Sequence, residues 1–323
     1  APVRRFRERV KPFGMLGFIF LTTALVSLQL ILSRGERMDW FNANEIWIAT
    51  GLVVISFYLF SIHTATSKRP YIDPGVFQDR NFVIGCCLIM ILGAQWLAFL
   101  TLVSPFLQLM AGYPVVTAGV AMMPQAFGNG LAAVLAGRLI GRFHPRNLML
   151  VGVAVLVSAD WQMSLLALDF NPMRFYFIAL AHGFGLGFFF VPMTVVTFST
   201  LPARHTNIGT GLYALGRNFG SSIGVSLTVA FLVRTTQIHH AELSASVNPF
   251  NEALRHIPLP EIWSLAETTG LAALNAVATR QAVALAYIND FRWMAIVTLV
   301  LIPLTLMTRY PWPSRSSVSA AAQ

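Results

Sequence analysis

Apolar runs about as long as a membrane is thick constrain this chain more than any other feature. About twenty helical residues, at 1.5 Å each, cross a hydrocarbon core roughly 30 Å thick. Such runs must be helical, because unpaired backbone groups in lipid are costly. The predicted spans are residues 13–32, 46–62, 82–103, 115–139, 148–168, 175–198, 208–233 and 288–307. We therefore expect an all-α membrane protein of about eight transmembrane helices.

Composition excludes several other classes of protein. Hydrophobic residues make up 56% of the chain and charged residues only 11%, whereas soluble domains carry about 25% charged residues. The net charge of +9 does not indicate nucleic-acid binding, because the basic residues lie in short loops and not on one face. Cys86 and Cys87 are adjacent inside an apolar run, which suits neither a disulfide framework nor a metal site. No zinc-protease, serine-hydrolase or phosphate-loop motif is present, so we expect neither an enzyme, a metal site nor a cofactor.

Loop charges predict the orientation. Basic residues are more numerous in the loops on the side of Ala1, which predicts that both ends are cytoplasmic. The long loop over 234–287 is then outside, and its Ala- and Leu-rich part, 263–287, is expected to form surface helices. The first residues lack a signal-peptide pattern, and we expect that the chain is truncated upstream. The tail 314–323 is predicted to be disordered.

Small residues recur at helical spacing in two spans, and a third span carries glycines at alternate positions. Residues four apart share a helix stripe and let backbones approach closely in a membrane. One interpretation is static packing, and the other is smooth surfaces on which bundles rock during transport. Glycines at alternate positions 183–187 are expected to loosen their helix. The two stripes are Gly216, Gly220 and Gly224, and Ala133, Gly137 and Gly141; the alternate glycines are Gly183, Gly185 and Gly187.

Arg217, Asp160 and His182 are charged or titratable residues that lie well inside spans. Arg217 lies about 14 Å inside its span at 1.5 Å per residue, and a buried guanidinium there marks either a transport pathway or a structural partner. Asp160 lies in the outer third of its span beside Trp161, so we interpret it as an interfacial anchor. His182 could titrate near neutral pH, although packing by a hydrogen bond is the alternative.

Polar, aromatic and soft side chains gather in four of the spans. Aromatic faces attract cations and methionine adapts its shape, so these residues are candidates for a cavity that holds apolar, often cationic compounds. Burial of an amide against a neighbouring helix is the alternative for each. Pro124, Pro192 and Pro303 are expected to kink their helices, and Pro105 to help end the third span. The cavity candidates are Gln95, Trp96, Gln108, Gln125, Asn129, His182, Met193, Tyr213, Arg217 and Asn218.

The loop after the fourth span carries a family signature. Gly137, Leu139, Arg142 and Arg146 match the cytoplasmic loop signature of the major facilitator superfamily, and the resemblance implies a gating loop. Gly141 stands where that signature has an acidic residue, and His144 where it has glycine. The charge lock attributed to the loop is therefore not expected here.

Four further segments resemble the EmrB-type family of fourteen-span drug:proton antiporters. They are Ser33–Phe41, Asp73 with Phe77–Phe82, Ile238–Leu243 and Ser246–Asn251. The resemblance implies that 13–68 are two linker helices and that 82–310 are the C-terminal six-helix bundle, whose cavity is lined by the spans at 82–103, 115–139, 175–198 and 208–233. The remaining segments would be the basic segment 1–12, the loop 69–81 and the tail 311–323. The N-terminal helices with the proton-carrying carboxylates would then be absent from this sequence.

These observations lead to one functional hypothesis and two alternatives. The leading one is that the chain is the C-terminal half of an inner-membrane exporter of hydrophobic or cationic drugs, driven by protons and working by alternating access. The resemblance also implies a periplasmic adaptor and an outer-membrane channel as partners, with the outer loop 234–287 as a candidate docking surface. The alternatives are an exporter of a defined metabolite or siderophore, and a membrane scaffold that transports nothing.

Overall fold

The computed structural model describes residues 15–35, 38, 40–67, 74–166, 170–246 and 267–310. Several expectations lie wholly or partly outside these residues: those on 1–12, on part of Ser33–Phe41, on Asp73, on 247–266 and on the tail 311–323. Within the described residues, 8 helices are long and apolar enough to cross a membrane. The prediction of an all-α protein with about eight spans is confirmed.

The chain divides into two compact units, Ala1–Val76 and Phe77–Gln323. In the first unit, α1 (Met15–Arg34) pairs with α2 (Asn44–Thr66) through a connection containing the short helix η2 (Trp40–Asn42). Arg34 forms an ion pair of 2.8 Å with Glu45 at this end of the hairpin. Phe20 and His63 pack edge to face between the two helices, so the unit is an antiparallel helical hairpin.

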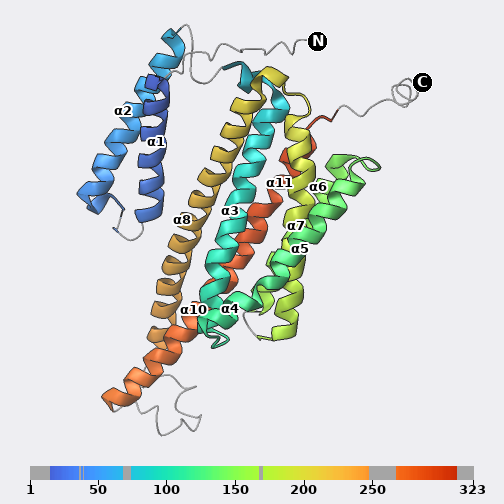
Figure 1. The fold of residues 1–323 in the computed structure, drawn as a ribbon. Coiled ribbons are helices and arrows are strands. Elements are labelled where there is room, and N and C mark those ends of the chain that lie inside the picture. The colour runs from blue at the N-terminus through green and yellow to red at the C-terminus, as the bar shows by residue number, and fades with distance from the viewer. Residues whose placement is uncertain are drawn as a thin grey trace, which may run out of the picture. The chain divides into compact units, whose positions relative to one another are not determined.

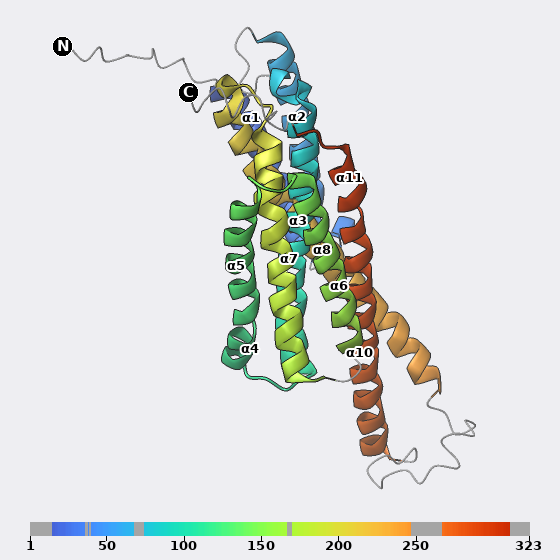
Figure 2. The same cartoon turned by 90° about the vertical axis from the view of Figure 1, so that its right-hand side faces the viewer.

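The second unit is a helical bundle whose start lies within η3 (Pro74–Gln78) (Figures 1 and 2). α7 packs against α5 and α6, α3 packs against α8, and α10 packs against α8 and α6. Its helices are α3 (Arg80–Leu109), α4 (Val115–Ala121), α5 (Met123–Leu139), α6 (Pro145–Leu166), α7 (Pro172–Phe198), η4 (Ala203–His205), α8 (Thr206–Ser246), α10 (Thr268–Leu299) and α11 (Leu301–Met307).

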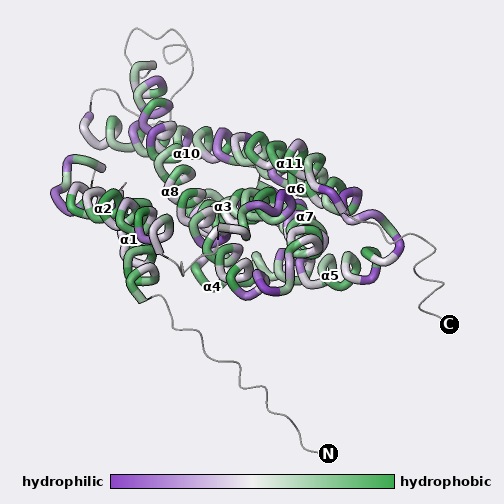
Figure 3. Tube along the Cα trace, turned by 90° about the horizontal axis from the view of Figure 1, so that it is seen from above, coloured by the Kyte–Doolittle hydropathy of each residue, from purple (hydrophilic) through white to green (hydrophobic). Residues whose placement is uncertain are grey.

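Hydrophobic residues occur all along the helices (Figure 3), and many large ones are exposed. Val116, Phe127 and Phe177 are each more than 60% exposed. Large exposed apolar surfaces are costly in water but not in lipid, where the tails are as apolar as the side chains. The outward faces of the bundle are therefore suited to contact lipid.

Two helix boundaries differ from those predicted. α8 continues beyond Val233 to Ser246, and α10 is one helix of 32 residues from Thr268 onwards. Separate surface helices before residue 288 are therefore a wrong prediction for the described residues. α10 extends past the ends of its neighbours (Figures 1 and 2), and it stays helical because it pairs with α8, where His240 Nε2 lies 2.9 Å from Asn275 Oδ1.

The prolines act as helix breaks at two of the predicted positions. The expected span 115–139 is divided at Met122 into α4 and α5, with Pro124 in the first turn of α5. The last span is divided at Val300, and Pro303 lies within α11. Pro105 does not end α3, which continues to Leu109, so that expectation is wrong.

Close contacts with neighbouring helices explain Gly220 and Gly224 of the α8 stripe and the alternate glycines of α7. On α8, a Cβ atom added to Gly220 would lie 1.8 Å from the carbonyl oxygen of Met90 in α3, and one added to Gly224 would lie 2.5 Å from Ala94 Cα. On α7, a Cβ atom added to Gly183 would lie 1.9 Å from the carbonyl oxygen of Gln125 in α5. The glycines of α7 therefore hold a tight contact instead of loosening the helix.

Gly137 and Gly141, the glycines of the other stripe, do not pack in this way. A Cβ atom added to Gly137 or Gly141 would meet nothing within 4 Å in the described structure. Gly216, at the start of the α8 stripe, has only ordinary contacts, with Cys86 and Ile89 both at 3.6 Å.

One end of the bundle is tied together by polar contacts of Asn81. Its side chain donates to the carbonyl oxygen of Arg309 and accepts from the Arg309 backbone N–H at 2.9 Å. It also donates to Thr200 Oγ1 at 3.2 Å, and Thr200 in turn donates to Asp79 at 2.9 Å. The start of α3, the link between α7 and α8, and the segment after α11 are thus joined through a side chain that is only 4% exposed.

We expect Asn81→Ala to lower the free energy of unfolding by about 2 to 3 kcal/mol, because the variant leaves the backbone groups of Arg309 without partners. Unfolding in mixed detergent micelles measures the effect. The control is Asn147→Ala, which changes an exposed asparagine whose side chain makes no hydrogen bond among the described residues. Equal effects of the two variants would contradict the role given to Asn81.

Candidate functional site

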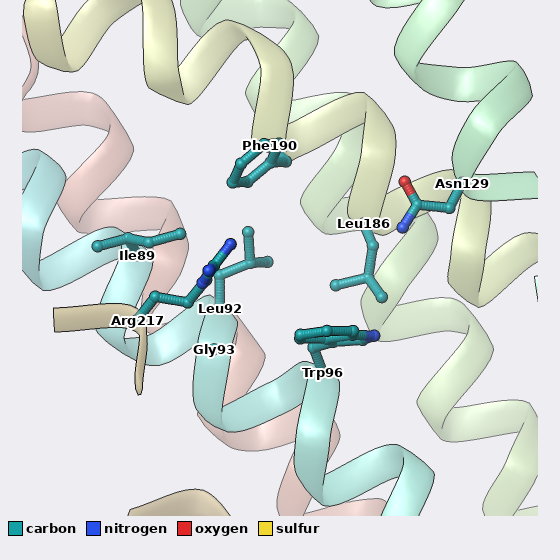
Figure 4. A pocket seen from close by; sticks show the side chains of 8 residues that line it. All are labelled: Ile89, Leu92, Gly93, Trp96, Asn129, Leu186, Phe190 and Arg217. Atoms are coloured by element: carbon teal, nitrogen blue, oxygen red, sulfur yellow. The ribbon is translucent and has the colours of Figure 1, made fainter. Parts of the chain in front are cut away.

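A pocket of about 200 Å³ opens between α3, α5, α7 and α8. Most of its wall is apolar or aromatic, and the polar groups come from Asn129 and Arg217 (Figure 4). The indole ring of Trp96 lies across one side of it, and it is 42% exposed. The lining residues are Ile89, Leu92, Gly93, Trp96, Asn129, Leu186, Phe190 and Arg217. An apolar pocket with a few polar groups is the usual form of a small-molecule site.

Arg217 is the one charged residue in this lining. Close packing places it there, since a Cβ atom added to Gly93 of α3 would lie 2.4 Å from the Arg217 carbonyl oxygen. The side chain itself is exposed, and within the described residues its guanidinium makes no hydrogen bond or ion pair. The expected buried arginine is therefore wrong, and so is the structural alternative in which carbonyl groups of a neighbouring helix bind it. The guanidinium remains available to a ligand.

A second group of polar side chains lies inside the bundle, where five helices meet. Asp160 of α6 and His182 of α7 are both 0% exposed, and their Oδ1 and Nε2 atoms are 3.6 Å apart. Gln95 of α3 donates a hydrogen bond to Asp160 Oδ2, and Thr298 of α10 lies 3.3 Å from the same oxygen. Gln125 of α5 approaches His182 Nδ1 at 3.2 Å. We call these five residues the buried polar cluster.

The interpretation of Asp160 as an interfacial anchor is wrong. The carboxyl group points into the bundle, and its neighbour Trp161 is the exposed residue, with Arg292 5.9 Å above its ring. A sequence signal was present, because Asp160 shares a helix stripe with Leu156 and Met163, which are also buried. Thr298 was not a predicted site residue at all, and a single threonine in an apolar helix gives no such signal.

The other cavity candidates do not reach the pocket. Gln108 binds Ser104 of its own helix at 3.1 Å, and Met193 is fully buried in the core. The Tyr213 hydroxyl lies 3.1 Å from Thr194, and Asn218 is exposed outside the lining. The structure thus brings Trp96, Asn129 and Arg217 into the pocket, while Gln95, Gln125 and His182 belong to the buried polar cluster.

The predicted gating loop lies at the same end as Asn81. Arg146 donates to the carbonyl oxygens of Leu306 and Thr308, the latter at 3.1 Å, and so it binds the free carbonyl groups at the end of α11. Leu139 is partly buried against the core, whereas Gly137 and Arg142 are exposed. Of these four residues, Arg146 is the one that links two helices.

A bundle of helices long and apolar enough to cross a membrane, with an apolar pocket between four of them, is the architecture expected of a membrane transporter. The chain belongs to the Major Facilitator Superfamily, which its residues 12–225 match. The family indicates a transporter, which is not a class of enzyme.

Relatives in several bacteria have export or resistance names. The chain is 30% identical to the "Multidrug export protein EmrB" of Escherichia coli (strain K12), over 77% of this chain and 49% of the relative. It is 32% identical to the protein of the same name in Haemophilus influenzae, over 75% and 48%. It is 26% identical to the "Fatty acid resistance protein FarB" of Neisseria gonorrhoeae, over 94% and 60%. The resemblance to EmrB-type proteins is confirmed, and the chain spans about half the length of the first two.

Proposed function

We propose that this chain is the C-terminal part of a secondary exporter that moves hydrophobic drugs outward in exchange for protons. The observation that carries the proposal is the exposed pocket with Trp96, Asn129 and Arg217. In an alternating-access cycle, the substrate would lie between this bundle and a second one. The names of the relatives support drug export, and a bacterial inner membrane with both ends cytoplasmic agrees with the loop charges.

The charge of the pocket favours acidic or neutral compounds over cationic ones. Arg217 is the only charged residue of the lining, and no carboxylate lies among the lining residues to attract a cation. An anionic group beside an apolar tail would match both the guanidinium and the aromatic wall of Trp96 and Phe190. The name of the gonococcal relative, a fatty acid resistance protein, supports this preference. The alternative substrate is a metabolite or siderophore that carries carboxylates, because it would bind the guanidinium of Arg217 in the same way.

We expect Arg217→Gln to raise the KM for an acidic amphiphile such as decanoate by about tenfold or more, because a hydrogen bond to a charged group contributes about 1.5 to 3 kcal/mol. Arg217→Lys should keep part of the affinity, since it keeps the charge but loses the planar fork. Uptake of a cationic dye into inverted vesicles is the control, and it should not fall in either variant. Equal losses for decanoate and dye would contradict an anion-binding role.

The hairpin of α8 and α10 is the candidate surface for a periplasmic adaptor, with an outer-membrane channel beyond it. His239 lies 3.0 Å from Asn289 and His240 2.9 Å from Asn275, so polar side-chain pairs join the two helices. A membrane scaffold that transports nothing is the competing function. Dye efflux by the full-length protein tests between them, because a scaffold produces none.

A further inference from the structure

The buried polar cluster contains two atoms that lack hydrogen-bond partners. Asp160 Oδ1 and His182 Nε2 have none among the described residues, and they face each other at 3.6 Å. Every other polar atom of the pair is engaged, since Gln95 and Thr298 approach Asp160 Oδ2 and Gln125 approaches His182 Nδ1. Buried polar groups are almost always hydrogen-bonded, so this gap needs an explanation.

A proton shared between Asp160 Oδ1 and His182 Nε2 would give both atoms a hydrogen-bond partner. A charge-assisted N–H···O bond is about 2.7 to 2.9 Å long, so the two groups would have to approach by less than about 1 Å. When the Gln125 amide donates to Nδ1, the proton of neutral His182 is on Nε2 and faces the carboxylate. Addition of one proton to the pair changes its net charge from −1 to zero, and release restores the charge.

No fixed cation competes for Asp160 among the described residues. α3 and α5 face the pair with amides, and α11 carries no ionisable residue. On α10, Arg292 lies over the Trp161 ring, and Asp290 is eight residues before Thr298, about 12 Å along the helix at 1.5 Å per residue. On α7, Arg174 is in the first turn. In the part of the chain that the structure describes, His182 is thus the one titratable group in contact with Asp160.

The surroundings shield the pair from water but leave it linked to two pockets. Phe99 stacks on the His182 ring, with centroids 3.6 Å apart and an angle of 14° between planes. Gln125 lies one helical turn before Asn129, which lines the pocket of Arg217. On the other side, Gln95 lines a pocket of about 190 Å³ between α3, α8 and α10. A change at the pair can therefore reach both pockets through an amide side chain.

We propose that Asp160 and His182 together bind one transported proton, and that Gln95 and Gln125 couple its arrival and departure to the substrate pocket. Loss of the proton leaves a buried charge without a counterion, which is costly, and the helices that carry the amides must then rearrange. This inference rests on the proposed export function and adds a proton site within this bundle to it.

The test uses the full-length protein in proteoliposomes with two readouts. Accumulation of substrate driven by a pH gradient requires proton transfer, whereas exchange of labelled for unlabelled substrate at equal pH does not. We expect Asp160→Asn to reduce gradient-driven accumulation by about tenfold or more while exchange stays within about twofold, because the carrier of the proton is removed and the pocket is not. His182→Gln should shift the pH at which gradient-driven transport is half-maximal.

The matched control is Asp290→Asn, which changes another buried carboxyl group of the same unit, 1% exposed. It should leave both readouts within about twofold of the wild type, since it does not contact the pair. Gradient-driven accumulation retained by Asp160→Asn, or equal loss of both readouts in a folded Asp160→Asn protein, would overturn the proposal. A wild-type protein that accumulates nothing would contradict the export function instead. The proton site is then judged by an infrared titration of the carboxyl band, which Asp160→Asn should remove and Asp290→Asn should keep.

Discussion

Gly220→Ala is expected to destabilise the bundle by about 2 to 3 kcal/mol, the usual effect of added volume in a packed contact. The new Cβ atom would lie 1.8 Å from the carbonyl oxygen of Met90, and a backbone atom cannot rotate away as a flexible side chain can. α8 would have to move away from α3, and Gly224, one turn further, would lose its contact with Ala94 as well. Unfolding of the full-length protein in mixed micelles measures the change.

Gly216→Ala is the matched control on the same stripe. Its Cβ atom would lie 3.6 Å from Cys86 and Ile89, an ordinary contact distance. The substitution should change the free energy of unfolding by less than about 1 kcal/mol, and a small gain is expected because alanine favours the helix. If the two variants were equally destabilised, the close approach of α3 and α8 at Gly220 would be wrong.

Trp96→Ala is expected to raise the KM for an aromatic substrate by about 30-fold, since loss of a central aromatic contact costs about 2 kcal/mol and 1.4 kcal/mol corresponds to tenfold. The indole ring forms one wall of the pocket (Figure 4), and truncation leaves that side open. Trp96→Phe should retain much of the affinity because it restores an aromatic face. Transport into inverted vesicles over a range of substrate concentrations gives the values.

Trp161→Ala is the control for general effects of tryptophan loss. Trp161 is similarly exposed, at 51%, but it lies on α6 under Arg292 and outside the pocket. We expect the KM of the Trp161→Ala variant to stay within about twofold of the wild-type value, since surface substitutions away from a site have small effects. A similar loss in both variants would argue against the pocket as the substrate site.

The spans could be predicted from sequence because hydrophobic length is a local property. The division at Met122 agrees with Pro124, whose missing N–H removes a helical hydrogen bond. Pro105 and Pro192 lie inside continuous helices, so proline alone does not determine where a helix ends. The continuation of α10 before residue 288 could not be predicted in the same way, because polar residues such as Thr279 and Arg280 weaken the apolar run. Pairing with α8 stabilises this part of α10, and that contact joins residues 35 positions apart, His240 and Asn275.

The site was predicted only in part for a similar reason. Residue type identified Trp96, Asn129 and Arg217 as cavity candidates, but it could not separate them from Met193 or Tyr213, which face the core. Which side of a helix faces a pocket depends on its neighbours. The sequence interpretation of Asp160 as an interfacial anchor was wrong for two reasons. Its hydrogen-bond partner Gln95 is 65 residues away in the chain. The position of a residue along a helix also does not show which side of the helix carries it.

Simultaneous measurement of proton and substrate fluxes tests the central claim most directly. The full-length protein is reconstituted into vesicles, a pH gradient of either sign is imposed, and an indicator dye and a labelled substrate are followed together. We expect substrate to move in the direction opposite to the protons, and the direction of substrate movement to reverse when the pH gradient is reversed. A proton ionophore should abolish accumulation. Substrate movement that is independent of the gradient, with no proton counterflow, would contradict the central claim.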